Sequence, residues 1–505
     1  MKTTSIPRTR SAPIDMPADE FRTVGHALVD KIADFLSTIR QRPVTPAEPP
    51  SHVKAVLNSD TPLPESGRDA GQVVSRAADL LFDHSLFNSH PRFLGYITSS
   101  AAPIGMLGDL LAAATNPNLG SWTLAPMASE IESQTIRWLA ELIGYPEPRG
   151  GLLVSGGTMA NFVGLLAARA AKVPWDVRKL GLNHPSAKHL RIYTSAETHT
   201  WIQKAADCFG FGTDNIRWIP TDDRQRLDVV ALRKAIDADL AHGDHPFLVI
   251  GTAGSVSTGA TDPLREIAAV CRDYDLWFHV DGAYGGLAAG IAGAPEDLKG
   301  LSMADSVAID PHKWLYAPLE AGAVLVRNPE DLRNAFSYHP PYYHFDEEVL
   351  NYVDYGMQNS RGFRALKVWL ALQQVGREGY ARMIEDDIRL AGAMFDAMHK
   401  HPEMEAVTHE LSITTFRFVP EDLREGVGSE PIETYLNDLN KELLTALERS
   451  GEAFVSPATV KGRFLLRACI VNFRTSLEDI EALPEIVSRL GRRVDAEMRA
   501  EKLAS

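Results

Sequence analysis

Cysteine is scarce in this chain, with Cys208, Cys271 and Cys469 as its only 3 examples among 505 residues. Three widely separated thiols do not form a disulfide framework, and none of the Cys and His spacings typical of zinc sites is present. We therefore interpret them as reduced thiols, expect a cytoplasmic protein and expect no metal ion.

The sequence also lacks long apolar runs and an excess of positive charge. No uninterrupted apolar stretch approaches the roughly 18–20 residues of a membrane span. Residues 1–21 begin with the basic Lys2, Arg8 and Arg10 but contain no apolar segment, so we expect no secretory signal there. The formal net charge is −15, and so acidic a surface repels nucleic acid and anionic lipid. We expect neither a membrane nor a nucleic acid as a partner.

Helical periodicity dominates the first part of the chain. Apolar residues recur at three- and four-residue steps from residue 17, which predicts a helix ending before Pro43. The segment from there to about residue 66 is rich in proline and polar residues, so we expect it to be extended. Further helices are predicted at 71–82, 103–115 and 128–143. Residues 1–95 are expected to form an N-terminal helical arm.

Short apolar runs alternate with helical stretches in the middle of the chain. Such runs are typical of the buried strands of a mainly parallel sheet. The predicted strands are 151–155, 189–193, 216–219, 246–251, 276–280, 306–309 and 323–326. We therefore predict an α/β fold with a large, mainly parallel-sheet domain over 96–375. A smaller α+β domain over 376–505 is expected to contain strands at 413–418 and 464–470.

The strongest chemical signal is Asp310-Pro311-His312-Lys313, which directly follows the predicted strand 306–309. Ligands bind at the carboxyl ends of the strands in open α/β sheets. A lone lysine in a loop is usually only a solvated charge. Two further motifs earlier in the chain give this lysine a chemical context.

Asp281 lies 32 residues before Lys313, at the end of the predicted strand 276–280. An anion at that edge suits a bound ring with a protonated nitrogen. Ala283, two residues later, is small enough for a ring to lie against the backbone. Taken alone, this aspartate is better explained as the cap of a turn.

The third motif is Ser155-Gly156-Gly157-Thr158-Met159, between the predicted strand 151–155 and a helix. Glycines at a helix start expose backbone N–H groups to an anion at the positive end of the helix dipole. A phosphate cradle, an anion for a ring nitrogen and a reactive lysine together predict pyridoxal 5′-phosphate (PLP) as the cofactor. Gly157, Thr158 and Met159 are expected to bind it, and Lys313 to carry it covalently.

In combination, these motifs resemble the group II PLP-dependent decarboxylases, which include aromatic-L-amino-acid, glutamate and histidine decarboxylases. The resemblance runs from Asp19-Glu20-Phe21-Arg22 to Leu466-Arg467-Ala468-Cys469, and the pairing of Asp281 with His312-Lys313 is its most specific part. It implies the aspartate-aminotransferase type I fold. It also implies a homodimer with shared active sites, in which the arm wraps the partner subunit.

The resemblance assigns further roles to single residues. His199 would stack on the cofactor ring and assist catalysis, and His312 would contact the phosphate. Arg467 would bind the carboxylate of the substrate, although an interdomain ion pair explains it equally well.

A tyrosine-rich loop at 334–344 matches the family's mobile catalytic loop. The tyrosine that protonates the substrate falls on Tyr342. Tyr343 and Tyr338 are the neighbouring alternatives if the alignment slips.

Two positions depart from the family pattern. Asp310 stands where members often have asparagine, and because a carboxylate repels phosphate we expect it to point away or to act through water. Val256 occupies the site of the hydroxyl residue that reaches the phenolic oxygen of the cofactor. This leaves Ser255 as the substitute.

The predicted function is decarboxylation of an L-amino acid to its amine. An aromatic substrate is favoured because the candidate pocket segments 93–99 and 118–122, with Tyr96 and Trp122, are apolar, aromatic or neutral. Arg92 keeps an acidic amino acid open as an alternative, since a buried carboxylate needs a paired cation. A decarboxylating aromatic aldehyde synthase is a second alternative, which the retention of His199 and Tyr342 disfavours.

Overall fold

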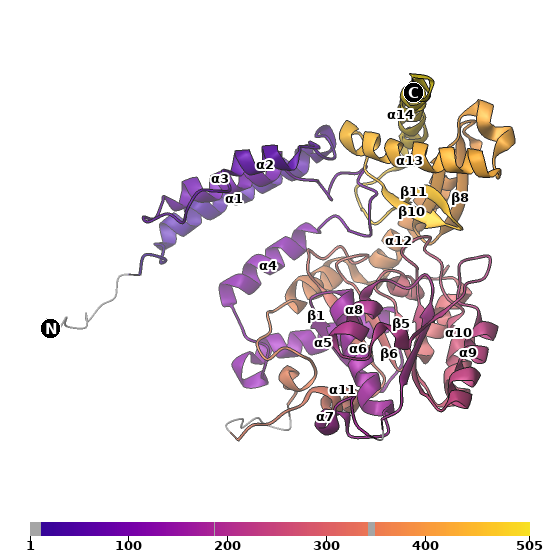
Figure 1. Ribbon diagram of the computed structural model, residues 1–505. Coiled ribbons are helices and arrows are strands. Elements are labelled where there is room, and N and C mark those ends of the chain that lie inside the picture. Colours follow the sequence, from indigo (N-terminus) through magenta and orange to yellow (C-terminus); the bar gives the residue numbers. More distant parts are fainter. Residues whose placement is uncertain (1–11, 186, 342–348, 505) are drawn as a thin grey trace.

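The computed structural model describes residues 12–185, 187–341 and 349–504 (Figure 1). A seven-stranded sheet with the order β1-β7-β6-β5-β4-β2-β3 forms the centre of the large domain. Its strands are β1 (Gly150–Val154), β2 (Leu190–Ser195), β3 (Ile216–Ile219), β4 (His245–Thr252), β5 (Trp277–Asp281), β6 (Ser306–Ile309) and β7 (Gly322–Val326). All seven predicted strands are confirmed, with ends that differ by at most two residues.

The sheet is mainly parallel, as predicted. Strand β2 pairs parallel with β3 and β4, and β5 pairs parallel with β4 and β6. Only β7 runs against its neighbours β6 and β1. Strand β1 therefore runs in the same direction as β6, and the carboxyl ends of β1, β2, β4, β5 and β6 lie at one edge.

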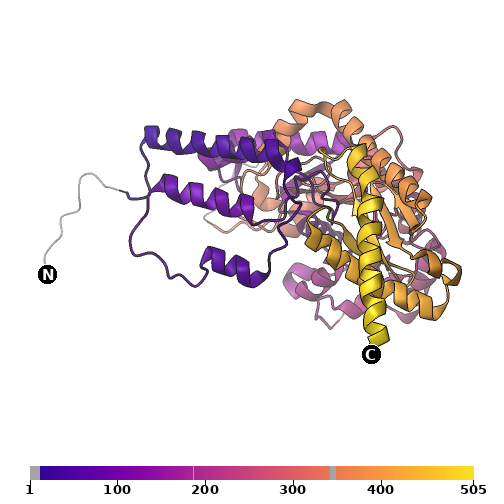
Figure 2. The same ribbon diagram turned by 90° about the horizontal axis from the view of Figure 1, so that it is seen from above.

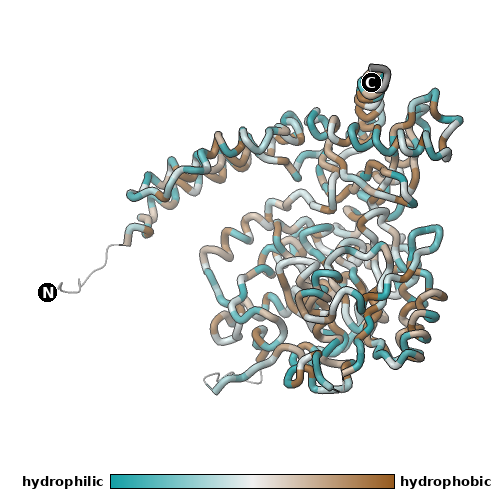
Figure 3. Tube along the Cα trace, in the orientation of Figure 1, coloured by the Kyte–Doolittle hydropathy of each residue, from teal (hydrophilic) through white to brown (hydrophobic). Residues whose placement is uncertain are grey.

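Helices cover both faces of this sheet. Its strands contribute alternate side chains to two core layers, such as Val249 to one and Leu248 to the other. In Figure 3, apolar and hydrophilic segments alternate along the chain of this domain. One layer packs against α6 (Gly157–Lys172) and α8 (Trp201–Cys208). The other packs against α5 (Pro126–Leu142), α9 (Val229–His242), α10 (Leu264–Tyr274) and the first part of α12 (Ala365–Lys400). Two shorter helices are α7 (Val177–Leu180) and α11 (Pro329–Phe336).

A second, antiparallel sheet lies in the C-terminal part of the chain, with the order β10-β11-β9-β8. Its strands are β8 (Met404–Glu410), β9 (Ile413–Phe418), β10 (Ser456–Val460) and β11 (Arg463–Cys469). The helices α13 (Glu430–Ser450) and α14 (Leu477–Ala504) and the end of α12 pack against it. Two of its four strands, β9 and β11, were predicted from the sequence.

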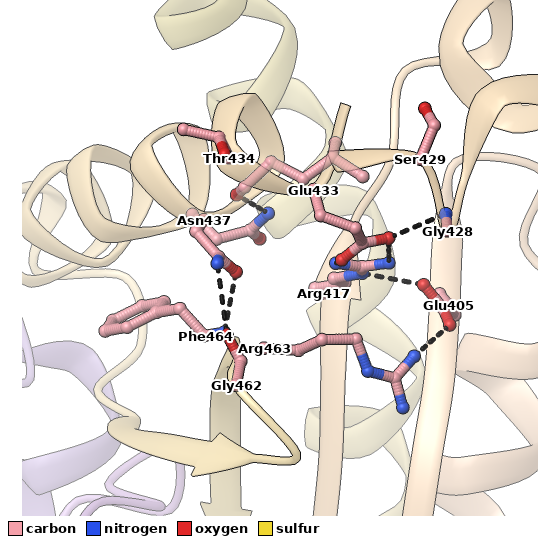
Figure 4. Close-up of polar contacts among 12 residues, drawn as sticks. Glu405, Arg417, Gly428, Ser429, Glu433, Thr434, Asn437, Gly462, Arg463 and Phe464 are labelled. Atoms are coloured by element: carbon pink, nitrogen blue, oxygen red, sulfur yellow. Dashed lines mark hydrogen bonds and ion pairs between the residues drawn. The ribbon is translucent and has the colours of Figure 1, made fainter. Parts of the chain in front are cut away.

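An ion-pair network ties this small sheet to α13. Figure 4 shows the fully buried Arg417 of β9 between two carboxylates, 2.6 Å from Glu405 and 2.7 Å from Glu433. Arg463 contacts the other oxygen of Glu405 at 2.8 Å. The two arginines and two glutamates thus neutralise each other where β8, β9, β11 and α13 meet.

The N-terminal arm projects from the rest of the chain (Figures 1 and 2). It contains α1 (Ala18–Thr38), α2 (Pro50–Leu57) and α3 (Ala70–Asp83), and α4 (Pro103–Thr115) follows. Phe35 of α1 stacks on Phe82 of α3 with ring centroids 4.4 Å apart. The prediction of an extended segment up to residue 66 was wrong, because α2 forms there. Pro50 occupies the first turn of α2, where proline lacks only an N–H that has no helical partner.

No helix within the described ranges is long and apolar enough to cross a membrane.

Candidate active site

A cavity of about 580 Å³ lies at the carboxyl edge of the seven-stranded sheet. Its wall contains residues at or shortly after the carboxyl ends of β1, β2, β4, β5 and β6, together with the start of α6. The parallel strands bring these segments together because their carboxyl ends share one edge. The predicted residues found in this wall are Gly157, Thr158, Met159, His199, Asp281, Ala283, His312 and Lys313.

The first turn of α6 forms an anion site in the cavity wall. Gly156 is the N-cap and Gly157 the first helical residue. A Cβ atom on Gly157 would lie 2.7 Å from Oδ2 of Asp310 and 2.9 Å from Cβ of Ala283, so a larger residue does not fit. The N–H groups of a first helical turn have no partner within their helix, and the helix dipole is positive there. This cradle fits a phosphate group.

Asp281 is the last residue of β5, and its carboxylate is buried at the cavity. Oδ2 accepts a hydrogen bond of 2.7 Å from Nε1 of Trp201, and Oδ1 accepts one of 3.2 Å from the N–H of Ala283. Two donors therefore fix the plane of this carboxylate. Trp201 was not predicted as a site residue, although it lies only two positions after His199 in the chain.

Lys313 lies in the turn after β6. Its backbone N–H donates to the carbonyl of Asp310 at 2.9 Å, which folds the lysine back over the strand end. Its Nζ lies 3.1 Å from Oδ2 of Asp310. Asp310 lies in the wall of the cavity, so the expectation that it points away was wrong. The nearby ammonium of Lys313 attracts this carboxylate into the site. Oδ1 of Asp310 is buried without a hydrogen-bond partner among the described residues.

Two histidines of the wall are held in their neutral form. Burial lowers the pKa of His199 below its ordinary 6.5, and this outweighs the opposing effect of Asp281. Nδ1 of His199 accepts a hydrogen bond from the N–H of Trp201 at 3.2 Å. Burial also lowers the pKa of His312, whose Nδ1 lies 2.7 Å from the carbonyl of Ala321. Both imidazoles therefore carry no charge near neutral pH.

The loop after β4 differs from its prediction. The hydroxyl of Ser255 does not reach the cavity wall and instead contacts the hydroxyl of Thr258 at 3.0 Å. Thr252 and Val256 lie in the wall in its place. Gly254 between them has φ +89°, and this turn directs successive side chains to different sides. Ser255 as the substitute therefore stays a prediction that this wall does not support, and Thr252 is a hydroxyl residue of the wall that the sequence did not single out.

The three predicted substrate-binding residues lie outside the cavity wall of this chain. Tyr96 is exposed, whereas its neighbours Ile97 and Thr98 line the cavity. Nε1 of Trp122 donates to Glu130 at 2.9 Å. The guanidinium of Arg467 is buried behind the wall and donates to the carbonyl of Val256.

Tyr342 and Tyr343 lie outside the described residues. The wall also contains Leu319 and Glu320, near the end of the connection between β6 and β7, and these two residues were assigned to no motif from the sequence.

The donor set fits PLP. Gly157 and its neighbours offer an anion cradle, Asp281 offers a fixed carboxylate, and Lys313 offers a primary amine, all in one cavity. Such a site on the aspartate-aminotransferase type I fold defines a PLP-dependent enzyme.

Comparisons with known proteins narrow this class. Residues 50–419 match the pyridoxal-dependent decarboxylase conserved domain. The chain is 33% identical to an aromatic-L-amino-acid decarboxylase of Bacillus atrophaeus, over 95% of this chain and 98% of the relative. It is 30% identical to a phenylacetaldehyde synthase of Arabidopsis thaliana, over 90% of this chain and 92% of the relative. The structure of Oryza sativa TDC with PLP and tryptamine is similar with a TM-score of 0.87 and 26% identity, over 96% of this chain and 99% of that one.

The chain therefore belongs to the pyridoxal-dependent decarboxylase family. It is a PLP-dependent amino-acid decarboxylase, and the predicted family and fold are confirmed.

Proposed function

We propose that this enzyme converts an aromatic L-amino acid to the corresponding amine and CO2. The observation that carries the proposal is the charge of the cavity wall. Lys313 is the only lysine or arginine among the described residues that line the cavity. The side chain of a glutamate or aspartate substrate would need a second cation, because an unpaired carboxylate is costly to bury. Ile97, Val256 and Leu319 instead give the wall apolar surface.

Arg92, the cation that kept an acidic substrate open, is engaged elsewhere. Its Nε lies 3.3 Å from Oδ1 of Asp479, and Arg40 contacts the same oxygen at 2.8 Å. Arg92 does not line the cavity. This arrangement supports an aromatic substrate over an acidic one.

The residues of the cavity wall would have different roles in the reaction. When bound, PLP supplies an electron-withdrawing ring that accepts the electron pair left by the departing CO2. Gly157, Thr158 and Met159 would hold the phosphate together with His312, and Ala283 and the neutral imidazole of His199 would hold the ring. Asp281 would keep a proton on the ring nitrogen. Lys313 would carry the cofactor, and Asp310 would pair with the amino group of Lys313 whenever that group is free.

The loop tyrosine completes this set. We propose, from the family resemblance, that the hydroxyl of Tyr342 donates the proton that replaces CO2 on the substrate carbon. The presence of His199 in the cavity supports amine formation rather than aldehyde formation.

A substrate panel tests the proposal. Tryptophan, tyrosine, phenylalanine, glutamate and aspartate are supplied at equal concentration, and amine, aldehyde and hydrogen peroxide are measured. We expect amine from at least one aromatic substrate at the highest kcat/KM. Preference for either acid would overturn the substrate class, and aldehyde with equimolar peroxide would assign the enzyme to the second candidate, a decarboxylating aldehyde synthase. That candidate is retained because several relatives are phenylacetaldehyde synthases.

We further propose a cytoplasmic homodimer with shared active sites, in which residues 1–95 wrap the partner. Domain boundaries near residues 95 and 375 belong to the same proposal. Large apolar side chains are exposed on the arm and on α4, as expected for surfaces that a second copy covers. They include Phe21, Leu81, Leu107, Leu110 and Leu111. Light scattering coupled to gel filtration should give the mass of two chains, and a fully active monomer would contradict the proposal.

A further inference from the structure

Three potential metal ligands meet in the N-terminal arm, outside the active-site cavity. Nδ1 of His84 lies 2.9 Å and 2.8 Å from the two carboxylate oxygens of Glu48. Nε2 of His52 lies 3.4 Å from Oε1 of the same carboxylate. One ligand atom from each residue lies within 4.8 Å of the other two. Two imidazoles and one carboxylate therefore surround a single point.

The local fold explains this convergence. Glu48 precedes the Pro49-Pro50 start of α2, and His52 lies in its first turn, four positions after Glu48. His84 is the C-cap of α3, which lies beside this segment. The carboxyl end of a helix carries partial negative charge, which favours a cation next to His84. The ligands thus come from two helices that are separated in the sequence by residues 58–69.

We propose that Glu48, His52 and His84 bind one zinc ion. Zinc prefers imidazole nitrogen and carboxylate oxygen at roughly 2.0–2.2 Å in tetrahedral geometry, so its ligand atoms lie about 3.3 Å apart. Oε1 of Glu48 lies 2.9 Å from Nδ1 of His84 and 3.4 Å from Nε2 of His52, both close to this value. All three ligand atoms lie within 4.8 Å of one another, so side-chain shifts would complete the tetrahedral spacing. Calcium and magnesium bind oxygen ligands, and two imidazoles therefore disfavour them. Three protein ligands leave the fourth position to water.

The ion has a structural consequence for α2. None of the residues of this eight-residue helix is buried, so no hydrophobic core holds it in place. So short a helix is marginal in water without tertiary support. The chain just before α2 is already fixed at Val44. The N–H of Val44 donates to the carbonyl of Gly451 at 2.8 Å, and the carbonyl of Val44 accepts from the N–H of Phe87 at 2.9 Å. Zinc at Glu48 and His52 would extend this fixed region into α2 and join it to α3.

Metal content of the holoenzyme tests the site. Tag-free protein is treated with a chelator, incubated with Zn²⁺ and passed through gel filtration, and zinc per chain is measured by elemental analysis. The variants are Glu48→Gln, His52→Gln and His84→Gln. The matched control is His242→Gln, which changes an exposed histidine that contacts one carboxylate, Asp244, at 3.2 Å.

We expect about one zinc per chain in the native enzyme and the control, and a loss of that zinc in all three variants. Circular dichroism and PLP absorbance verify that each variant is folded. No retained zinc in the native enzyme, or equal zinc in all five proteins, would overturn the proposal.

Hydrogen exchange provides a second measurement on the same samples. Zinc should slow amide exchange in residues 50–57 of the native enzyme and of His242→Gln, but not of His84→Gln. Equal protection of the His84→Gln variant would place the ion elsewhere and contradict the assigned ligands.

Discussion

Trp201 determines how Asp281 is oriented, and its replacement gives a sharp test of the active-site geometry. Its Nε1 donates to Oδ2 of Asp281 at 2.7 Å, while the N–H of Ala283 holds the other oxygen at 3.2 Å. Trp201 and Asp281 are both buried. Trp201→Phe keeps an aromatic ring but removes the shorter of the two hydrogen bonds. The carboxylate can then rotate away from the position that faces the cofactor ring.

The size of the effect follows from the hydrogen bond that is lost. A hydrogen bond to a charged group contributes roughly 1.5–3 kcal/mol. If the whole loss falls on the transition state, kcat/KM decreases by about 10- to 150-fold, because about 1.4 kcal/mol corresponds to a factor of ten. The assay measures kcat and KM for the preferred amino acid at saturating PLP, with PLP affinity from a separate titration.

Trp277→Phe is the matched control. Trp277 is also buried, at the start of β5, and its Nε1 donates to Oγ of Ser306 at 2.8 Å rather than to Asp281 at the other end of this strand. Both variants lose one indole hydrogen bond and part of a buried ring, so both should lower the melting temperature. We expect only Trp201→Phe to lower kcat/KM by tenfold or more. A native rate in Trp201→Phe, or an equal loss in both variants, would refute the positioning role.

Four further outcomes are expected. Lys313→Ala should abolish turnover and leave PLP removable by dialysis; a linkage to PLP that borohydride still reduces in this variant would assign the attachment to another lysine. Tyr342→Phe should lower amine formation and release aldehyde, ammonia and peroxide in air, whereas the same result in Tyr343→Phe alone would shift the register by one. Burial lowers the pKa of His279 from 6.5 to about 4. The unfolded chain therefore binds a proton at this histidine more readily than the folded chain does. The contribution of His279 to the free energy of unfolding should fall by about 3 kcal/mol between pH 6.5 and 4. Denaturant titrations at both pH values should show a smaller fall in His279→Gln. Asp310→Asn should tighten PLP binding in a fluorescence titration, because it removes a negative charge beside the phosphate site. Weaker binding would contradict this expectation.

In the small sheet, the predictability of a strand depended on where the strand lies. The central strands bury both faces, so their sequences are continuous apolar runs bounded by polar turns. Strands β8 and β10 are the two edges of the small sheet, and neither was predicted. Most residues of β8 are half-exposed, and β10 contains Pro457, which only an edge strand tolerates.

For the candidate site, the sequence predicted the positions of residues better than the directions of their side chains. Lys313, Asp281 and Gly157 follow strand ends, and the topology of a parallel sheet alone brings such positions together. Side-chain direction is set by local turns and by neighbours distant in the sequence. The sequence therefore did not reveal that Trp201 binds Asp281, or that Arg467 is held behind the wall by the carbonyl of Val256.

Asp310 shows how a local electrostatic argument can be reversed by the fold. From the sequence, repulsion by phosphate predicts that the carboxylate turns away. In the structure its Oδ2 lies 3.1 Å from Nζ of Lys313 and 3.7 Å from Nε2 of His312. The same oxygen lies against Gly157 at the positive end of α6, where a negative charge is stabilised. The carboxylate of Asp310 and a bound phosphate would therefore compete for stabilisation by the amino end of α6. With an asparagine at position 310, the phosphate would be the only anion at this helix end. The carboxylate of Asp310 should therefore lower the affinity for PLP, while it provides an ion-pair partner for the amino group of Lys313.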